Sequence, residues 1–139
     1  MKLRLTKHFT IEMAHALPAY DGKCAGIHGH SYHLSVTVES QASPAADGLV
    51  MDFALLKHIV QQHVVDPFDH ALVLPQSDKG HIDLGPYNAK LIQTPFQPST
   101  ENLLLHFAAL VEPHLPAGVA LHSITLAETD TSTAELVVG

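Results

Sequence analysis

The chain has 139 residues, 46% hydrophobic and 15% charged, which is typical of one compact globular domain over residues 1–139. A formal net charge of -7 argues against nucleic acid as the main partner, and no apolar run is long enough to span a membrane. The single cysteine excludes an intrachain disulfide framework, and the first residues lack a signal-peptide core, so we expect a cytoplasmic protein.

Two alternating segments predict β-strands over about residues 2–15 and 28–40. His15 ends the first segment with the parity of its apolar residues, while His28 and His30 open the second on one face. An antiparallel hairpin through the turn-rich loop between them would bring the three imidazoles together. Three histidines with an open fourth position are the usual arrangement of a catalytic zinc site, so we expect one Zn²⁺ here.

Cys24 lies in the loop that precedes His28, and three interpretations of its thiol are open. It can be a small buried hydrophobe, as a lone cysteine usually is. It can be a fourth metal ligand, which would close the site and make it structural. It can also be a reactive thiolate whose pKa is lowered by nearby positive charge.

A first helix is predicted after Asp52, a plausible N-cap, and Pro67 is expected to stop it. Asp69 and His70 follow at once; an adjacent carboxylate can orient an imidazole for acid–base work, although the pair alone is weak evidence. Residues 75–97 show no clear period and contain several prolines and glycines, so we interpret them as a long surface insertion.

A second helix is predicted from Ser99 or Thr100, either of which suits the N-cap, with Glu101 favourable in the first turn. Simple capping explains these residues without any binding role. Pro113 is expected to end the helix.

Two more strands, at about 119–129 and 133–138, complete a ββααββ order. One face of the first is predicted to carry His122, Ile124, Leu126 and Glu128. Glu128 interrupts the apolar pattern of that face. It either lies in water at the end of the sheet or holds a ligand rich in hydrogen-bond donors.

Several short motifs occur in an order that resembles the 6-pyruvoyltetrahydropterin synthase and 6-carboxytetrahydropterin synthase family. They are Phe9 to His15, Cys24 to His30, Val50 to Phe53, Asp69-His70, Pro98 to Asn102 and Glu128-Thr129. The short Cys-to-His spacing resembles the bacterial carboxy branch. The resemblance implies the α+β tunnelling fold (T-fold), a four-stranded antiparallel sheet with two helices on one face that joins other subunits in a barrel. A homo-hexamer, a dimer of trimers with active sites between subunits, is the implied assembly.

The resemblance also implies the roles of the residues in these motifs. His15, His28 and His30 would bind zinc, and Cys24 would be the general base, with Asp69 and His70 completing a proton relay. Substrate-binding roles fall to Glu128, Ser99, Thr100 and Glu101.

The implied reaction is the conversion of 7,8-dihydroneopterin triphosphate to 6-carboxy-5,6,7,8-tetrahydropterin, with release of acetaldehyde and triphosphate, in queuosine-type biosynthesis. A pyruvoyl synthase of the biopterin route is one alternative. A non-catalytic module with a closed Cys24 and three-histidine zinc site is another.

The triphosphate end of the substrate is where the chain departs from the family pattern. The carboxy branch often carries an arginine where this chain has Ala25-Gly26-Ile27, and the insertion at 75–97 is longer than in the shortest members. Arg4 is the sole arginine of the chain. Lys23 is therefore the expected phosphate contact, with His33, Lys79 and Lys90 as weaker choices.

Overall fold

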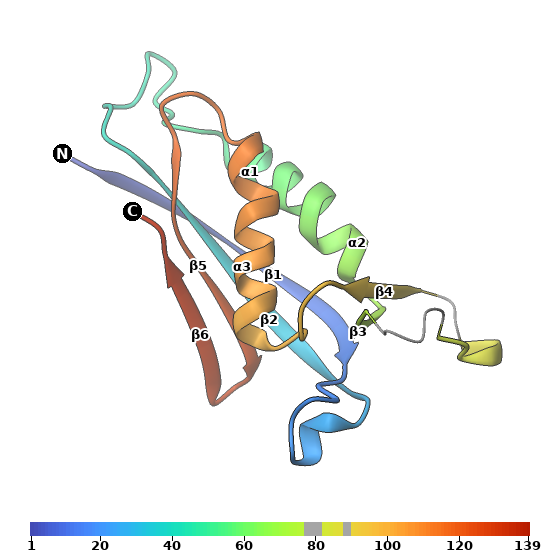
Figure 1. Cartoon of the computed structure of the whole chain (residues 1–139). Coiled ribbons are helices and arrows are strands. Elements are labelled where there is room, and N and C mark those ends of the chain that lie inside the picture. The colour runs from blue at the N-terminus through green and yellow to red at the C-terminus, as the bar shows by residue number, and fades with distance from the viewer. Residues whose placement is uncertain (77–81, 88–89) are drawn as a thin grey trace.

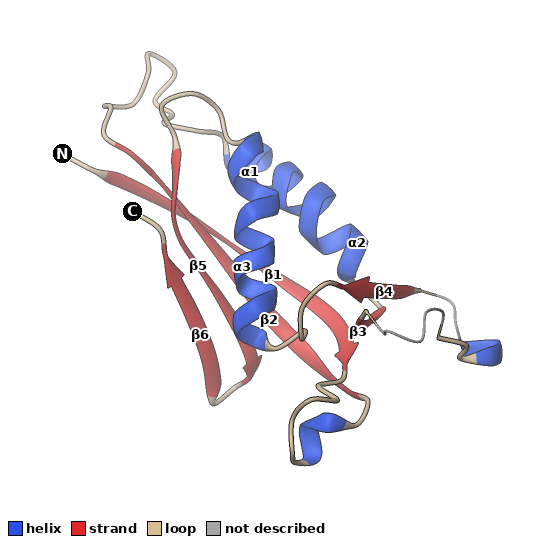
Figure 2. Cartoon of the chain, viewed as in Figure 1, coloured by secondary structure: helices blue, strands red, loops and turns tan. Residues whose placement is uncertain are grey.

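The computed structural model describes residues 1–76, 82–87 and 90–139 of the chain. It is an α+β structure in which the strands form one twisted layer and the helices cover one face of it (Figure 1, Figure 2). The predicted position of Lys79 lies outside the described residues, as do 77–81 and 88–89 of the expected insertion.

Six strands form a single mixed sheet in the order β4-β3-β1-β2-β5-β6. Their bounds are β1 Leu3–His15, β2 His28–Ser40, β3 Ala71–Pro75, β4 Leu91–Thr94, β5 Ala120–Thr129 and β6 Ser132–Val137. The expected four-stranded antiparallel sheet corresponds to β1, β2, β5 and β6. The expectation was wrong in omitting β3 and β4, which extend the sheet in parallel beside the end of β1. The segment 75–97 therefore contains sheet structure and a short turn of helix, η3 (Gly85–Tyr87), and is not all loop.

The first helical segment runs from α1 (Phe53–Val60) through a π-helical stretch, η2 (Gln61–Val65), into α2 (Asp66–Phe68). Asp52 is its N-cap as predicted, because its side chain accepts a 2.8 Å hydrogen bond from the backbone N–H of Ala54. Pro67 lies near the C-terminal end of this continuous segment, and helical structure ends one residue past it, at Phe68.

The second helix, α3 (Thr100–Val111), continues into a short turn, η4 (Glu112–His114). Ser99 is its N-cap, accepting at 3.1 Å from the N–H of Asn102. The buried face of α3 packs against β5 and β6, and Figure 1 shows α3 running alongside β5. No helix among the described residues is long and apolar enough to cross a membrane.

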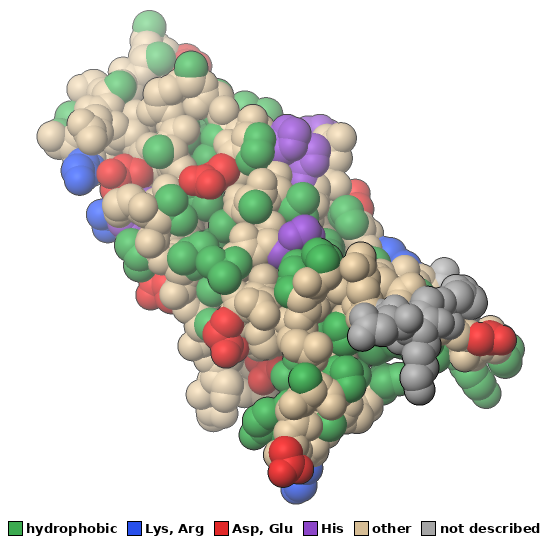
Figure 3. All heavy atoms as spheres, in the orientation of Figure 1, with side chains coloured by type: hydrophobic (Ala, Val, Ile, Leu, Met, Phe, Trp, Pro, Cys, Tyr) green, Lys and Arg blue, Asp and Glu red, His purple; other side chains and the backbone are tan. Residues whose placement is uncertain are grey.

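The two faces of the β1–β2 hairpin differ sharply in polarity. Ile11, Tyr32, Leu34 and Val36 are buried beneath the helices. The other face carries cross-strand polar pairs, among them Arg4–Glu39, Thr6–Thr37, His8–Ser35 and Glu12–Ser31. The face seen in Figure 3, which includes the helices, has scattered carboxylates and few basic side chains, in keeping with the negative charge of the chain.

A β-bulge in β5 corrects one predicted face. The β2–β5 register shifts after Thr37, so that Leu121 pairs with Val38 and enters the core where His122 was expected. Because a bulge inserts one extra residue, it reverses the side-chain parity on its far side. His122 lies instead 3.9 Å from the Glu39 carboxylate.

Candidate metal centre and active site

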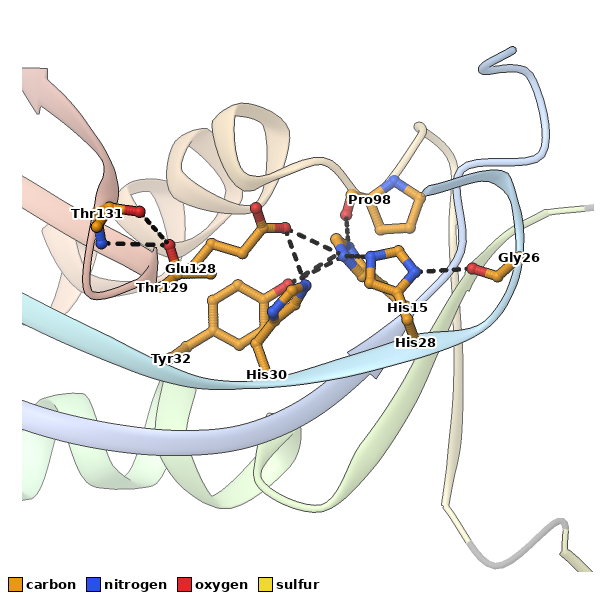
Figure 4. Close-up of polar contacts among 9 residues, drawn as sticks. All are labelled: His15, Gly26, His28, His30, Tyr32, Pro98, Glu128, Thr129 and Thr131. Carbon is orange, nitrogen blue, oxygen red and sulfur yellow. Dashed lines mark hydrogen bonds and ion pairs between the residues drawn. The ribbon is translucent and has the colours of Figure 1, made fainter. Parts of the chain in front are cut away.

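Three imidazoles meet at one end of the β1–β2 hairpin, as the strand parity predicts. His15 pairs directly with His28, and the next inward-facing pair is Met13 with His30. The Nε2 atoms of His15 and His28 are 2.9 Å apart. Glu128 from β5 completes the group, with Oε1 3.3 Å from Nε2 of both His15 and His30 (Figure 4). One potential ligand atom from each of these four residues lies within 4.8 Å of the other three.

Backbone carbonyls fix the orientation of two of the rings. Nδ1 of His15 is 2.6 Å from the Pro98 carbonyl oxygen, and Nδ1 of His28 is 2.8 Å from that of Gly26. A carbonyl oxygen only accepts, so each Nδ1 donates and each Nε2 presents a lone pair. Two lone pairs facing each other at this distance repel unless they share a cation.

The remaining ring and the burial of the site favour a metal ion as that cation. Nε2 of His30 is buried without a hydrogen-bond partner in the described structure. His15 is 1% exposed, and this burial is the main reason that its pKa is lowered, which keeps its ring neutral. Three imidazoles aimed at one point, with a carboxylate beside them, are a donor set that fits a divalent metal ion.

Tyr32 is a member of the site that the sequence analysis did not single out. It is fully buried, and its hydroxyl lies 3.2 Å from Nε2 of His15. Burial, followed by the negative charges of Glu128 and Cys24, raises the pKa of Tyr32. The hydroxyl therefore stays protonated and can donate to the site. Tyr32, His28 and His30 occupy alternate positions of β2 and so share one face, and this spacing in the sequence could have identified Tyr32 as a neighbour of the site.

Cys24 lies close to this centre but outside the ligand group. It is half-buried in a single turn, η1 (Lys23–Ala25), held to the end of β1 by a 2.9 Å bond from the Leu17 N–H to the Cys24 carbonyl. Among the described residues, Glu128 and not Cys24 accompanies the three histidines. This geometry does not support the closed site of one cysteine and three histidines.

Three of the five predicted substrate-binding residues line one hollow, and the other two do not. Glu128, Thr100 and Glu101 line one hollow of about 380 Å³ together with residues of β6. Glu128 thus lies between the histidines and this hollow, with 26% of its side chain exposed. The side chain of Ser99 is occupied in capping α3. Lys23 is exposed.

Asp69 and His70 follow α2 and lie beside Glu12 of β1, outside the group formed by the three histidines and Glu128. Asp69 accepts at 2.8 Å from the Glu12 N–H and at 2.8 Å from Nδ1 of His70; the Glu12 bond, then that of His70, lowers the pKa of Asp69. With Glu12, His30 and Ser31, His70 borders a hollow of about 390 Å³.

The backbone at His70 is strained. Its φ is +62°, in the left-handed region that costs a residue other than glycine on the order of 1–3 kcal/mol. The side chain is 76% exposed, so it is free to meet another molecule. The sole arginine, Arg4, pairs instead with Glu39 at the far end of the hairpin, at 2.8 Å.

The fold and site together define an α+β protein with a candidate histidine–carboxylate metal centre at the end of a long hairpin. The sequence model of the 6-pyruvoyl tetrahydropterin synthase family matches residues 4–137. The chain belongs to this family.

Named relatives and solved structures agree with this assignment. The chain is 33% identical over 140 residues to a 6-carboxy-5,6,7,8-tetrahydropterin synthase of Haemophilus influenzae, covering 95% of this chain and 96% of that protein. It is also 33% identical over 112 residues to the human 6-pyruvoyl tetrahydrobiopterin synthase, covering 78% and 66%. A Plasmodium vivax 6-pyruvoyltetrahydropterin synthase structure superposes with a TM-score of 0.74 at 20% identity, covering 99% of both chains. The architecture is therefore the T-fold of this family.

Proposed function

We propose that this protein is a zinc-dependent lyase that converts 7,8-dihydroneopterin triphosphate to 6-carboxy-5,6,7,8-tetrahydropterin. Acetaldehyde and triphosphate would be released, with uptake of one water. The observation that carries the proposal is the cluster of His15, His28, His30 and Glu128 beside a hollow lined by polar side chains. Three imidazoles with one further position are the ligand set that zinc prefers at catalytic sites.

Each group of residues in the site has a chemical task in this reaction. Zinc, when bound, would supply a Lewis acid for the oxygens of the substrate side chain. Cys24, as a thiolate, would take a carbon-bound proton. His70, oriented by Asp69, would move the second proton. Glu128, with Thr100 and Glu101, would accept hydrogen bonds from the amino and ring N–H groups of the pterin.

The carboxy product is favoured over the pyruvoyl product by the relatives. Proteins named 6-carboxy-5,6,7,8-tetrahydropterin synthase from Haemophilus influenzae and Synechocystis match 95% and 92% of this chain. The human pyruvoyl protein is matched over a smaller share of both chains. The product would then feed 7-deazaguanine biosynthesis.

The test is to incubate the purified zinc-loaded protein with dihydroneopterin triphosphate and identify the products by mass spectrometry. We expect 6-carboxytetrahydropterin together with acetaldehyde, which an alcohol dehydrogenase assay measures separately. A pyruvoyl product without acetaldehyde would support the alternative synthase. An unchanged substrate would contradict both and leave the non-catalytic module.

We further propose that the active site is completed between subunits. Within one chain, Asp69 and His70 lie outside the group formed by the three histidines and Glu128. Two sheet edges are also open: β3 pairs with β1 only at Met13–His15, and within the described residues no strand covers the rest of that edge or the outer edge of β6. Head-to-tail pairing of these edges would close a ring of subunits and bring the Asp69–His70 pair of one copy toward the metal centre of another.

This arrangement predicts that the protein is oligomeric, with a hexamer built from two trimeric rings as the expected species. Light scattering coupled to size-exclusion chromatography at micromolar concentration measures the mass directly. A protein that remains monomeric under these conditions would contradict the shared site. In that case Asp69 and His70 would have no route to the metal centre.

A second prediction concerns the division of substrate affinity between the pterin and the triphosphate. Glu128→Gln keeps the shape of the side chain but removes its charge, and should weaken binding by about 1.5–3 kcal/mol. Lys23→Ala removes an exposed cation and should cost less, on the order of 1 kcal/mol, with a smaller cost at higher salt.

Binding of the intact triphosphate is best measured by calorimetry in a Cys24→Ala background, where turnover is suppressed. Zinc content is measured in parallel, because Glu128 also faces the metal cluster. Normal binding by Glu128→Gln together with lost binding by Lys23→Ala would show that phosphate, not the pterin, is recognised first.

A further inference from the structure

The turn formed by Asp69 and His70 is held on one side by β1. The Glu12 N–H donates to the Asp69 side chain at 2.8 Å, and the His70 N–H donates to the Glu12 carbonyl oxygen at 2.5 Å. These bonds fix the inner side of a turn whose second residue has a positive φ. The Asp69 carbonyl is not part of this set and has a partner of its own.

That partner is Lys90, the residue that precedes β4. Its ammonium donates to the carbonyl oxygens of Asp66 at 2.7 Å and of Asp69 at 2.6 Å. Both carbonyls lie at the C-terminal end of the helical segment, where backbone acceptors lack partners within the helix and a cation is favourable. The backbone of Lys90 is itself fixed, because its carbonyl accepts from the Leu72 N–H at 2.9 Å.

We propose that Lys90 is a positioning residue for His70. Glu12 of β1 binds the Asp69 side chain and the His70 N–H, and Lys90 fixes the same turn by binding the Asp69 carbonyl oxygen. The inference rests on the proposed role of Asp69 and His70 in proton transfer. This role would give β4 a structural function, because the strand positions the Lys90 ammonium against the Asp66 carbonyl of α2. It also makes Lys90 a poor triphosphate ligand, because two of its three N–H donors are already directed at backbone carbonyls.

The expected consequence is a change in turnover with little change in substrate affinity. A proton-transfer group displaced by about 1 Å can cost ~100-fold in rate, even when the change is made away from the reacting atoms. The side chain of His70 is 76% exposed and, among the described residues, bonds only within its own turn, to Asp69 at 2.8 Å, so little packing would restore its position once the turn loosens.

The experiment compares Lys90→Met, Lys90→Arg and the control Lys57→Met in the full-length protein. Lys57 is exposed on α1, so its replacement removes the same charge away from the turn. We expect Lys90→Met to lower kcat by ~10–100-fold with KM within about twofold. Lys90→Arg should recover most of the loss, since a guanidinium also donates to two carbonyls. Lys57→Met should behave as wild type.

Amide hydrogen exchange gives a readout that does not need turnover. The His70 amide, bonded to Glu12, should exchange faster in Lys90→Met than in wild type or Lys57→Met. Unchanged exchange and unchanged kcat in Lys90→Met would overturn the proposal. A raised, salt-dependent KM with normal kcat would overturn it too and make Lys90 a phosphate contact. If the wild-type protein consumes no substrate, the proposed function fails, while exchange at His70 still decides whether Lys90 holds the turn.

Discussion

Replacing His28 or His30 with alanine is expected to remove the bound metal and to lower turnover by at least about 10³-fold. The loss follows because a Lewis acid at this position supplies several kcal/mol of transition-state stabilisation. Both side chains are only partly buried, so their removal should leave the sheet intact. His15 is a poorer choice for the test, because it is almost fully buried and its loss would also open a cavity.

The measurement is zinc per subunit by elemental analysis, with turnover measured on the same samples. His33→Ala is the matched control, because His33 lies on the same strand but its ring pairs with Thr10 on the opposite face. It should keep its zinc; its turnover is compared at saturating substrate, since His33 is also a candidate phosphate contact. A full complement of zinc in His28→Ala or His30→Ala would remove these residues from the metal site.

Replacing Cys24 with alanine is expected to abolish most of the activity while leaving the metal and the assembly unchanged. The thiol lies outside the group formed by the three histidines and Glu128, so the metal does not need it. Loss of a positioned acid–base group should lower turnover by roughly 10²–10⁴-fold. The thiol is half-buried in a single turn, and alanine fills most of its volume.

Zinc content, light scattering and turnover of the Cys24→Ala variant test this together. Cobalt substitution of the wild-type protein adds a direct view of the ligands, because a bound thiolate gives a strong sulfur-to-metal charge-transfer band. We expect no such band. A band in the wild type and zinc loss in the variant would establish Cys24 as a ligand and point to a structural site.

The sequence by itself determined that three histidines meet at one end of the hairpin. Side chains in a strand alternate strictly, and one buried face fixes the register of a hairpin. The apolar residues of β1 and β2 therefore carry His15, His28 and His30 to the same side and the same end. The caps of both helices were equally local, because Asp52 and Ser99 satisfy N–H groups two or three residues away.

Only the tertiary structure decided what joins those histidines. Glu128 shares the face of Leu126 by parity, but it reaches the rings because β5 pairs with β2 rather than with another strand. Tyr32 followed the histidines on their face and was indistinguishable in sequence from a core residue. Its place in the site became visible once its hydroxyl was found beside His15.

The parallel strands and the contacts that they create were beyond the sequence. β3 and β4 are five and four residues long, too short for a periodic signal, and each pairs with a partner far away along the chain. Non-local pairing of this kind leaves no local pattern. Neither the position of Asp69 and His70 beside Glu12 nor the contact of Lys90 with their turn could therefore be derived from the sequence.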